Sequence, residues 1–167
     1  LVEKEDYLTA LYLAHYAPAR QWPPVEDWIR RNLEQLPSPF VLELGHRLMQ
    51  KRPKAGFQWF LAGTYAVERD VARCRDKELD WVLGLTQRLY GRHWLYAQRR
   101  PQLLKRSADI ALPWVEQRTA AQPDWICAHG DGRLLSEPLL DQDEWQQMAE
   151  ALGQRFRAKI HNKMARR

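Results

Sequence analysis

Residues 55–73 read AGFQWFLAGTYAVERDVAR and form a long, mainly apolar segment of the chain. Its first part, 55–67, carries no charge, and large apolar side chains recur on most sides of a helix drawn through it. A helix that is apolar nearly all round is buried. The pattern therefore predicts a central helix on which the rest of the chain packs. The uncharged part is shorter than the ~20 residues that a membrane span needs, so no membrane span is expected.

Helices marked by prolines are predicted before the central one. Residues 24–36 place five apolar side chains in one stripe at helical spacing, and Pro24 stands near the first helical position. Residues 38–51 follow, with Ser38 as the N-cap, and end before Pro53. A helix is also expected over residues 4–16.

Three further helices are predicted after the central one. The first covers residues 76–91, and the second starts at Pro101 and is broken or kinked at Pro113. The last starts at Asp141, which forms a capping box with Glu144 three residues later. The stretch between Gly91 and Pro101 is compatible with either a helix or a turn.

Residues 125–136 show a different pattern. Trp125, Ile126 and Cys127 are separated from Leu134 and Leu135 by a glycine-rich run, which predicts a short β-hairpin. The fold class is thus mainly all-α. We expect one domain over residues 1–167, a compact irregular bundle of six or seven helices with this one hairpin, and a frayed tail over 161–167.

The basic residues are unevenly distributed. The chain has a net charge of +5, yet residues 81–108 and 151–167 each carry six Lys or Arg and no acid. Because these segments together carry +12, the remaining residues sum to −7. This asymmetry favours an anionic partner or two complementary faces, although a solvated basic face is the simpler explanation of each run.

The basic segments also contain the best candidate binding residues. Arginine binds phosphates and carboxylates through a bidentate fork, and aromatic rings offer stacking surfaces. The candidate basic, aromatic-rich face consists of Arg88, Arg92, Trp94, Tyr96, Arg99, Arg100, Arg106, Arg155 and Lys159. We expect a non-catalytic helical domain that binds another protein through this face. The alternative is a nucleic-acid-binding module that uses residues 88–106 and 155–167. The sequence does not indicate the oligomeric state.

A second set of polar residues follows the apolar half of the central helix. Several of its members lie three residues apart, a spacing that suits ion pairs within a helix. Charges on a buried helix need partners, so this set is predicted to be a structural network that fixes the fold. A catalytic carboxylate at Glu68 is the alternative. The set consists of Tyr65, Glu68, Asp70, Arg73 and Asp76.

The two cysteines, Cys74 and Cys127, are compatible with one disulfide, which would indicate an oxidising compartment. The chain begins at Leu1 without an initiator methionine, so processing or a shortened sequence is expected. Together these features favour an exported, periplasmic protein over a cytoplasmic one with two buried thiols. Neither cysteine has a second ligand at metal-binding spacing, and no metal or cofactor is expected.

Catalytic motifs are weak. The five histidines are scattered along the chain. Glu43 and His46 are three residues apart and share a helix face. They form either half of an acid–base or metal site, or an ordinary surface pair. The run His129-Gly130-Asp131 is similar to the catalytic loop of aminoglycoside-type kinases. Because no phosphate loop precedes it and no metal-binding Asn follows, a tight turn is favoured.

Overall fold

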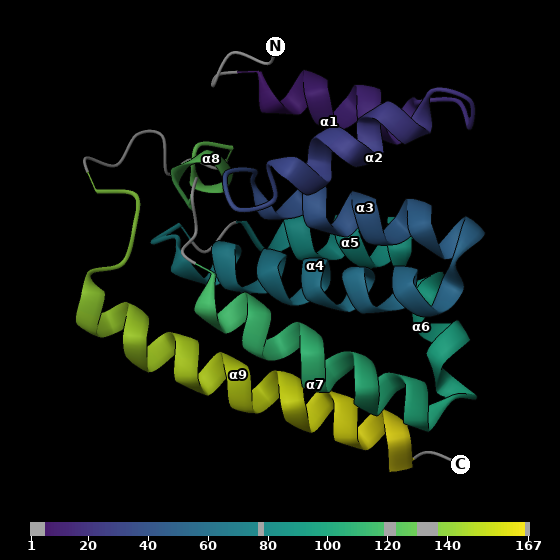
Figure 1. Ribbon diagram of the computed structural model, residues 1–167. Coiled ribbons are helices and arrows are strands. Elements are labelled where there is room, and N and C mark those ends of the chain that lie inside the picture. Colours follow the sequence, from purple (N-terminus) through teal and green to yellow (C-terminus); the bar gives the residue numbers. More distant parts are fainter. Residues whose placement is uncertain (1–5, 77–78, 119–122, 130–136, 166–167) are drawn as a thin grey trace.

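The chain folds into a stack of helices (Figure 1). The computed structural model describes residues 6–76, 79–118, 123–129 and 137–165. The helices of the described part are α1 (Tyr7–Tyr16), α2 (Trp22–Arg31), α3 (Ser38–Lys51), α4 (Pro53–Arg73), α5 (Asp80–Tyr90), α6 (Arg92–Gln98), α7 (Pro101–Gln117), α8 (Pro123–Cys127) and α9 (Gln142–Ala165). The predicted all-α fold class is confirmed.

Helix α4 is the central element. It packs against α3, α5, α6, α7, α8 and α9, and Figure 1 shows it in the middle of the stack. Its large side chains Phe57, Phe60, Leu61 and Tyr65 are almost fully buried. The apolar stretch that suggested a central helix therefore fills the core, as predicted.

Helices α3 and α4 form an antiparallel hairpin joined at Arg52. They approach so closely that a Cβ atom on Gly45 would collide with the backbone of Phe60, and one on Gly63 with the backbone of Leu42. Glycine is required at both positions because only hydrogen fits between the two backbones. The α3–α4 hairpin is therefore a tightly packed unit, and the other helices pack around it.

The helix starts follow the sequence signals. Helices α3, α4 and α7 each have a proline in the first turn. Backbone N–H groups there have no partner within the helix, so the N–H that proline lacks removes no helical hydrogen bond. The capping box before α9 forms as predicted. The Glu144 amide donates to Asp141 Oδ1 at 2.8 Å, and the Asp141 amide donates to Glu144 Oε2 at 3.3 Å.

The predicted hairpin is wrong in its first half. Trp125, Ile126 and Cys127 belong to α8, and the partner residues lie outside the described part of the chain. Ile126 and Cys127 are buried against the core, and this packing outweighs a short apolar run that is ambiguous between helix and strand.

Three other regions refine the expected boundaries. The undecided stretch after Gly91 is helical and forms α6, and α7 continues through Pro113. Helix α9 extends through Ala165, beyond residue 161 where fraying was expected, because Met164 still packs on the core.

No helix in the described part of the chain is both long enough and apolar enough to cross a membrane.

Candidate functional site

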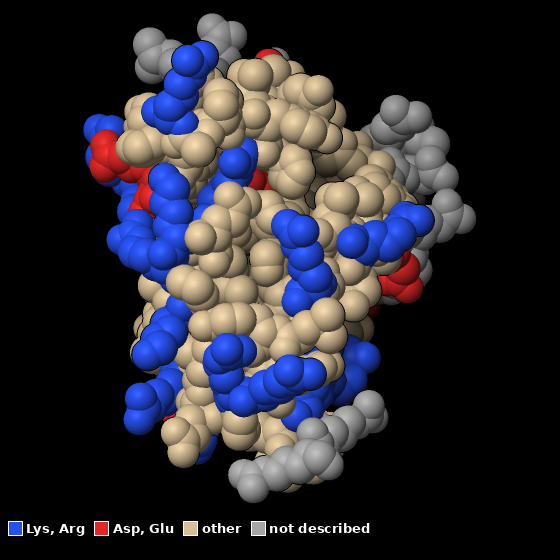
Figure 2. Space-filling model, turned by 90° about the vertical axis from the view of Figure 1, so that its right-hand side faces the viewer, with Lys and Arg blue, Asp and Glu red and all other residues tan. Residues whose placement is uncertain are grey.

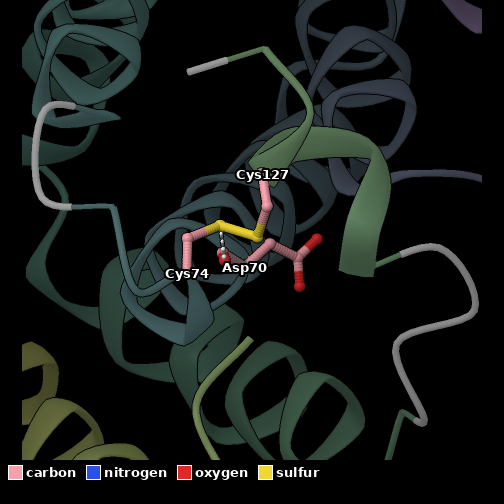
Figure 3. Close-up of a disulfide and its surroundings, with 3 residues drawn as sticks. All are labelled: Asp70, Cys74 and Cys127. Carbon is pink, nitrogen blue, oxygen red and sulfur yellow. Dashed lines mark hydrogen bonds between the residues drawn. A yellow bond between two sulfur atoms is a disulfide. The ribbon is translucent and has the colours of Figure 1, made fainter. Parts of the chain in front are cut away.

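The two cysteines form a disulfide, as predicted (Figure 3). Cys74 follows the last residue of α4 and Cys127 ends α8, and their Cα atoms are 5.5 Å apart. Cys74 Sγ also lies 3.4 Å from the carbonyl oxygen of Asp70. A five-residue helix is not stable alone, so this bond fixes α8 against α4.

The polar side chains of 65–76 connect α4 to other helices. The Tyr65 hydroxyl donates to Glu116 Oε1 on α7 at 3.0 Å, and Lys159 on α9 donates to Glu68 at 2.8 Å. Asp70 is buried, which raises the pKa of its carboxyl, while nearby Ser38 and Arg118 act in the opposite direction. Tyr65 and Glu68 of the predicted network thus make contacts to other helices.

Two members of that network line a polar cavity of about 260 Å³. Asp70 and Arg73 contribute from α4, together with Arg69. Arg118 lies just after α7 and Trp145 lies in α9, so residues distant in sequence complete the lining. The guanidinium carbons of Arg69 and Arg73 lie 5.0 and 5.5 Å from the centre of the Trp145 ring. We call this site the arginine cavity.

Most of the candidate basic face lies at one end of the molecule, whereas Arg155 lines another pocket together with Glu68 and Asp80. Arg88, Arg92, Arg99, Arg100 and Arg106 are exposed, as are Arg155 and Lys159 of α9. Figure 2 looks at the end of the stack where α4 and α7 begin and α9 ends, and most of the charged side chains on that face are Lys or Arg. The two basic segments meet here, because Lys159 and Lys163 both lie over the Trp94 ring, at 5.6 and 4.9 Å from its centre.

The aromatic side chains of that face are less exposed than the sequence suggested. Trp94 is only 5% exposed, because it packs edge-on against Phe57 and Phe60 beneath the two lysines. Tyr96 is half-buried, and the guanidinium of Arg100 stacks over its ring at 4.1 Å. The face is therefore basic, and Trp94 supports it from below.

An apolar groove of about 290 Å³ runs between α1 and α5, and the sequence did not point to it. Leu8 and Leu11 line it from α1, and Trp81, Leu85 and Leu89 from α5. Residues of α3 form part of its lining, α8 contributes Trp125 and Ile126, and the turn after α8 contributes His129. We call this site the α1–α5 groove.

A closed polar cluster lies near the end of this groove. Glu43 is fully buried and accepts hydrogen bonds from Arg47 Nε at 3.0 Å, the Tyr90 hydroxyl at 3.0 Å and His15 Nδ1 at 2.8 Å. These contacts, here called the Glu43 cluster, join α1 and α5 to α3. Glu43 and His46 are therefore not a surface pair.

Two histidines extend the Glu43 cluster toward α6. His46 Nδ1 and His93 Nε2 share a hydrogen bond of 2.8 Å. Burial lowers the pKa of both rings to about 4, and the positive charge of Arg92 adds to the shift. Both rings are therefore neutral at neutral pH, which fits a hydrogen bond in which one ring donates and the other accepts.

Neither polar site has a metal-binding arrangement. Within the residues that the structure describes, no three His, Cys, Asp or Glu side chains are grouped to hold a metal ion. Comparison with protein-family models, curated proteins and solved structures gives no match to the chain. Its function therefore has to be inferred from the geometry of the groove, the basic face and the arginine cavity.

Proposed function

We propose that the chain is a non-catalytic helical domain that binds another protein through the α1–α5 groove. The observation that carries this proposal is the exposure of large apolar side chains at the groove. Leu8 is 59% exposed, Trp81 51% and Leu89 47%. Exposed apolar patches of this kind mark interaction sites in folded proteins.

The shape of the groove suits an amphipathic helix. Helices α1 and α5 run in the same direction, since His15 and Tyr90 near their C-terminal ends are in contact while Leu8 and Trp81 near their starts line the same groove. Ten or eleven residues of helix give a groove of roughly 15 Å, which spans about three turns of a partner helix. Apolar anchors at positions i, i+3, i+4 and i+7 would fill it.

The charges beside the groove indicate an acidic partner segment. Arg88 on α5 and Arg92 at the start of α6 are exposed, and neither forms an ion pair with a described residue. Both lie toward the end of the groove at Tyr90. Glutamate or aspartate flanking the apolar anchors of the partner would meet these guanidiniums and set the direction of binding.

Two synthetic amphipathic helices test this proposal. Both carry the same leucine stripe, but one has Glu and the other Lys at the flanking positions. We expect the acidic peptide to bind more tightly by calorimetry. Leu89→Asp should weaken its binding at least about tenfold, because a charge would enter the apolar contact.

The matched control is Ile110→Asp on α7, which is also exposed and does not line the groove. It should leave peptide affinity unchanged. Equal loss in both variants, or no binding of either peptide, contradicts the proposal. Sedimentation of the chain alone adds a further check: a dimer that Leu89→Asp dissociates would make a second copy the occupant.

The disulfide adds a proposed location. Disulfides persist in oxidising compartments, so we place the domain outside the cytoplasm, as in a periplasm. Alkylation of the denatured, unreduced protein from its own cells tests this: Cys74 and Cys127 should resist modification. Two free thiols would contradict the assignment.

Nucleic-acid binding is a second candidate, favoured by the meeting of the two basic segments around Trp94. It predicts affinity whose logarithm falls linearly with the logarithm of salt concentration. Substituting Arg99 and Arg100 with Gln should weaken such binding and reduce the salt slope. Absence of binding at low salt rejects this candidate.

A further inference from the structure

The arginine cavity lies among α4, α7 and α9, and none of its lining residues lines the α1–α5 groove. Its volume of about 260 Å³ equals roughly nine water molecules at their liquid volume. This is just below the range typical of drug-sized ligands. The space therefore fits a small molecule.

The lining has an excess of positive charge. Within the part of the chain that the structure describes, Arg69, Arg73 and Arg118 line the cavity together with two acids, Asp70 and Glu116. Glu116 is already neutralised, because Arg157 on α9 donates to both of its carboxylate oxygens at 2.7 Å. Asp70 is left as the carboxylate that faces Arg118 and Arg69, and burial raises the pKa of its carboxyl more than these two guanidiniums lower it. Among the described lining residues, three guanidiniums therefore share one carboxylate that is not already paired.

Two of these guanidiniums also have unmet hydrogen-bonding capacity. The Nε atoms of Arg73 and Arg118 are buried and have no hydrogen-bond partner. None of Arg69, Arg73 and Arg118 forms an ion pair within 4.0 Å with a described residue. Buried donors without partners are rare in native proteins, and an ion, water or ligand is the usual explanation.

Other contacts fix the arginines in place. The Arg118 guanidinium donates to the carbonyl oxygens of Leu33 and Leu36, which fixes the segment after α7 to the turn that follows α2. Arg69 and Arg73 are stacked against Trp145. Guanidiniums held in this way lose little conformational freedom when they bind, which favours affinity.

We propose that the arginine cavity binds a small organic oxyanion, a carboxylate or phosphate monoester, through Arg69, Arg73 and Arg118. Each guanidinium offers donors in a planar fork that matches the oxygens of either group. Trp145 supplies an apolar wall for the rest of the ligand. The groove and the cavity have separate linings, so this inference stands whether or not a partner helix binds the groove.

Calorimetry with inorganic phosphate and with succinate as probes tests the inference on the whole chain at low chloride. We expect saturable binding of at least one probe at or below about 10 mM. Arg73→Gln and Arg69→Gln should each weaken it by about tenfold or more, because each removes a charged hydrogen-bonding partner. Having two variants guards against misfolding of either one, and unfolding curves show which is folded.

The matched control is Arg99→Gln, which removes the same charge from the exposed basic face. It should change the affinity by less than about twofold. The indole N–H signals of Trp145 and Trp94, assigned by substitution to Phe, locate the ligand by NMR, and only the Trp145 signal should shift. Phosphate binding lost equally in Arg99→Gln, a shift confined to Trp94, or no saturation by either probe would overturn the inference.

Discussion

Two polar centres of this molecule differ in how their charges are matched. In the Glu43 cluster, where α1 and α5 meet α3, the buried carboxylate accepts three hydrogen bonds and no oxygen of it is left without a partner. In the arginine cavity, where α7 and α9 meet α4, buried Nε atoms of two arginines have none. The Glu43 carboxylate is fully hydrogen-bonded within the chain, whereas the arginine cavity contains buried N–H donors without a partner.

Buried charge therefore has two distinct roles in this chain. A fully paired network stabilises one arrangement of helices, and removal of any member leaves the others desolvated and unpaired. A partly paired site makes a smaller contribution to stability, because its donors were never matched inside the chain. The first kind should be sensitive to mutation in unfolding experiments, and the second in binding experiments.

Glu43→Ala should produce the largest loss of stability. It leaves Arg47 charged and without its carboxylate, and it removes the acceptor that Tyr90 and His15 share. Breaking a buried pair in this way costs about 3–5 kcal/mol, measurable by urea unfolding. Asp27→Ala, which removes an exposed ion pair with Arg31, is the control and should cost less than about 1 kcal/mol. Similar costs for the two variants would contradict the closed character of the Glu43 cluster.

Removal of the disulfide should have the next largest effect. The double substitution of Cys74 and Cys127 by Ser releases a constraint over a sequence separation of 53 residues. A loss of about 2–4 kcal/mol is expected, because the unfolded chain regains the freedom that the cross-link removed. Thermal unfolding with and without reductant measures it. A reductant effect on the wild type that the double variant lacks is the internal control, and no effect in either would contradict a formed disulfide.

Stability should also decline in mild acid. The pKa of His46 and of His93 is lowered to about 4 in the folded chain and is 6.5 when unfolded. Between these values only the unfolded chain gains protons, so stability is complete above pH 6.5 and falls toward pH 4. The loss by pH 5 is about 2 kcal/mol for each ring.

The groups around these rings define the control. His15, Arg47 and Arg92 add positive charge near His46, so protonation there is opposed from α1, α3 and α6. His93→Gln removes one of the two titrating rings and should reduce the slope of stability against pH between 6.5 and 4. A slope that is unchanged in this variant would show that other groups dominate the pH dependence.

The fold was largely predictable because its signals are local. Pro39, Pro53 and Pro101 stand in the first turns of three helices, and the apolar stretch of α4 occupies the core. The failure at residues 125–127 has a physical cause: a short apolar run fits a helix or a strand, and here the disulfide and the core packing favour the helix.

The sites were less predictable, since their members are distant in sequence. Glu43 meets His15 and Tyr90 across separations of 28 and 47 residues, and no local spacing announces such a contact. Arg118 and Trp145 reach the arginine cavity in the same way. Trp94 shows the opposite error, because a tryptophan between arginines suggested an exposed face, whereas its indole fills the core beneath two lysines.

An arginine can be replaced by methionine at each of the two centres. Arg47→Met removes a guanidinium that donates to Glu43 and to the carbonyl oxygens of Ala14 and His15, so it should cost about 2–4 kcal/mol. Arg73→Met removes a guanidinium whose buried Nε has no partner, while methionine keeps apolar contact with Trp145. Its cost should stay below about 1 kcal/mol, the value of the lost cation–π contact.

The small loss of stability expected for Arg73→Met distinguishes a role of Arg73 in binding from a role in holding the fold together. If the arginines of the cavity are kept for a ligand, Arg73→Met should unfold at nearly the same urea concentration as the wild type when anions are scarce. Added phosphate should then raise the midpoint of the wild type more than that of the variant, since a ligand stabilises only the state that binds it. Equal unfolding costs for Arg47→Met and Arg73→Met would mean that both centres hold the fold together, and the contrast drawn between them would be wrong.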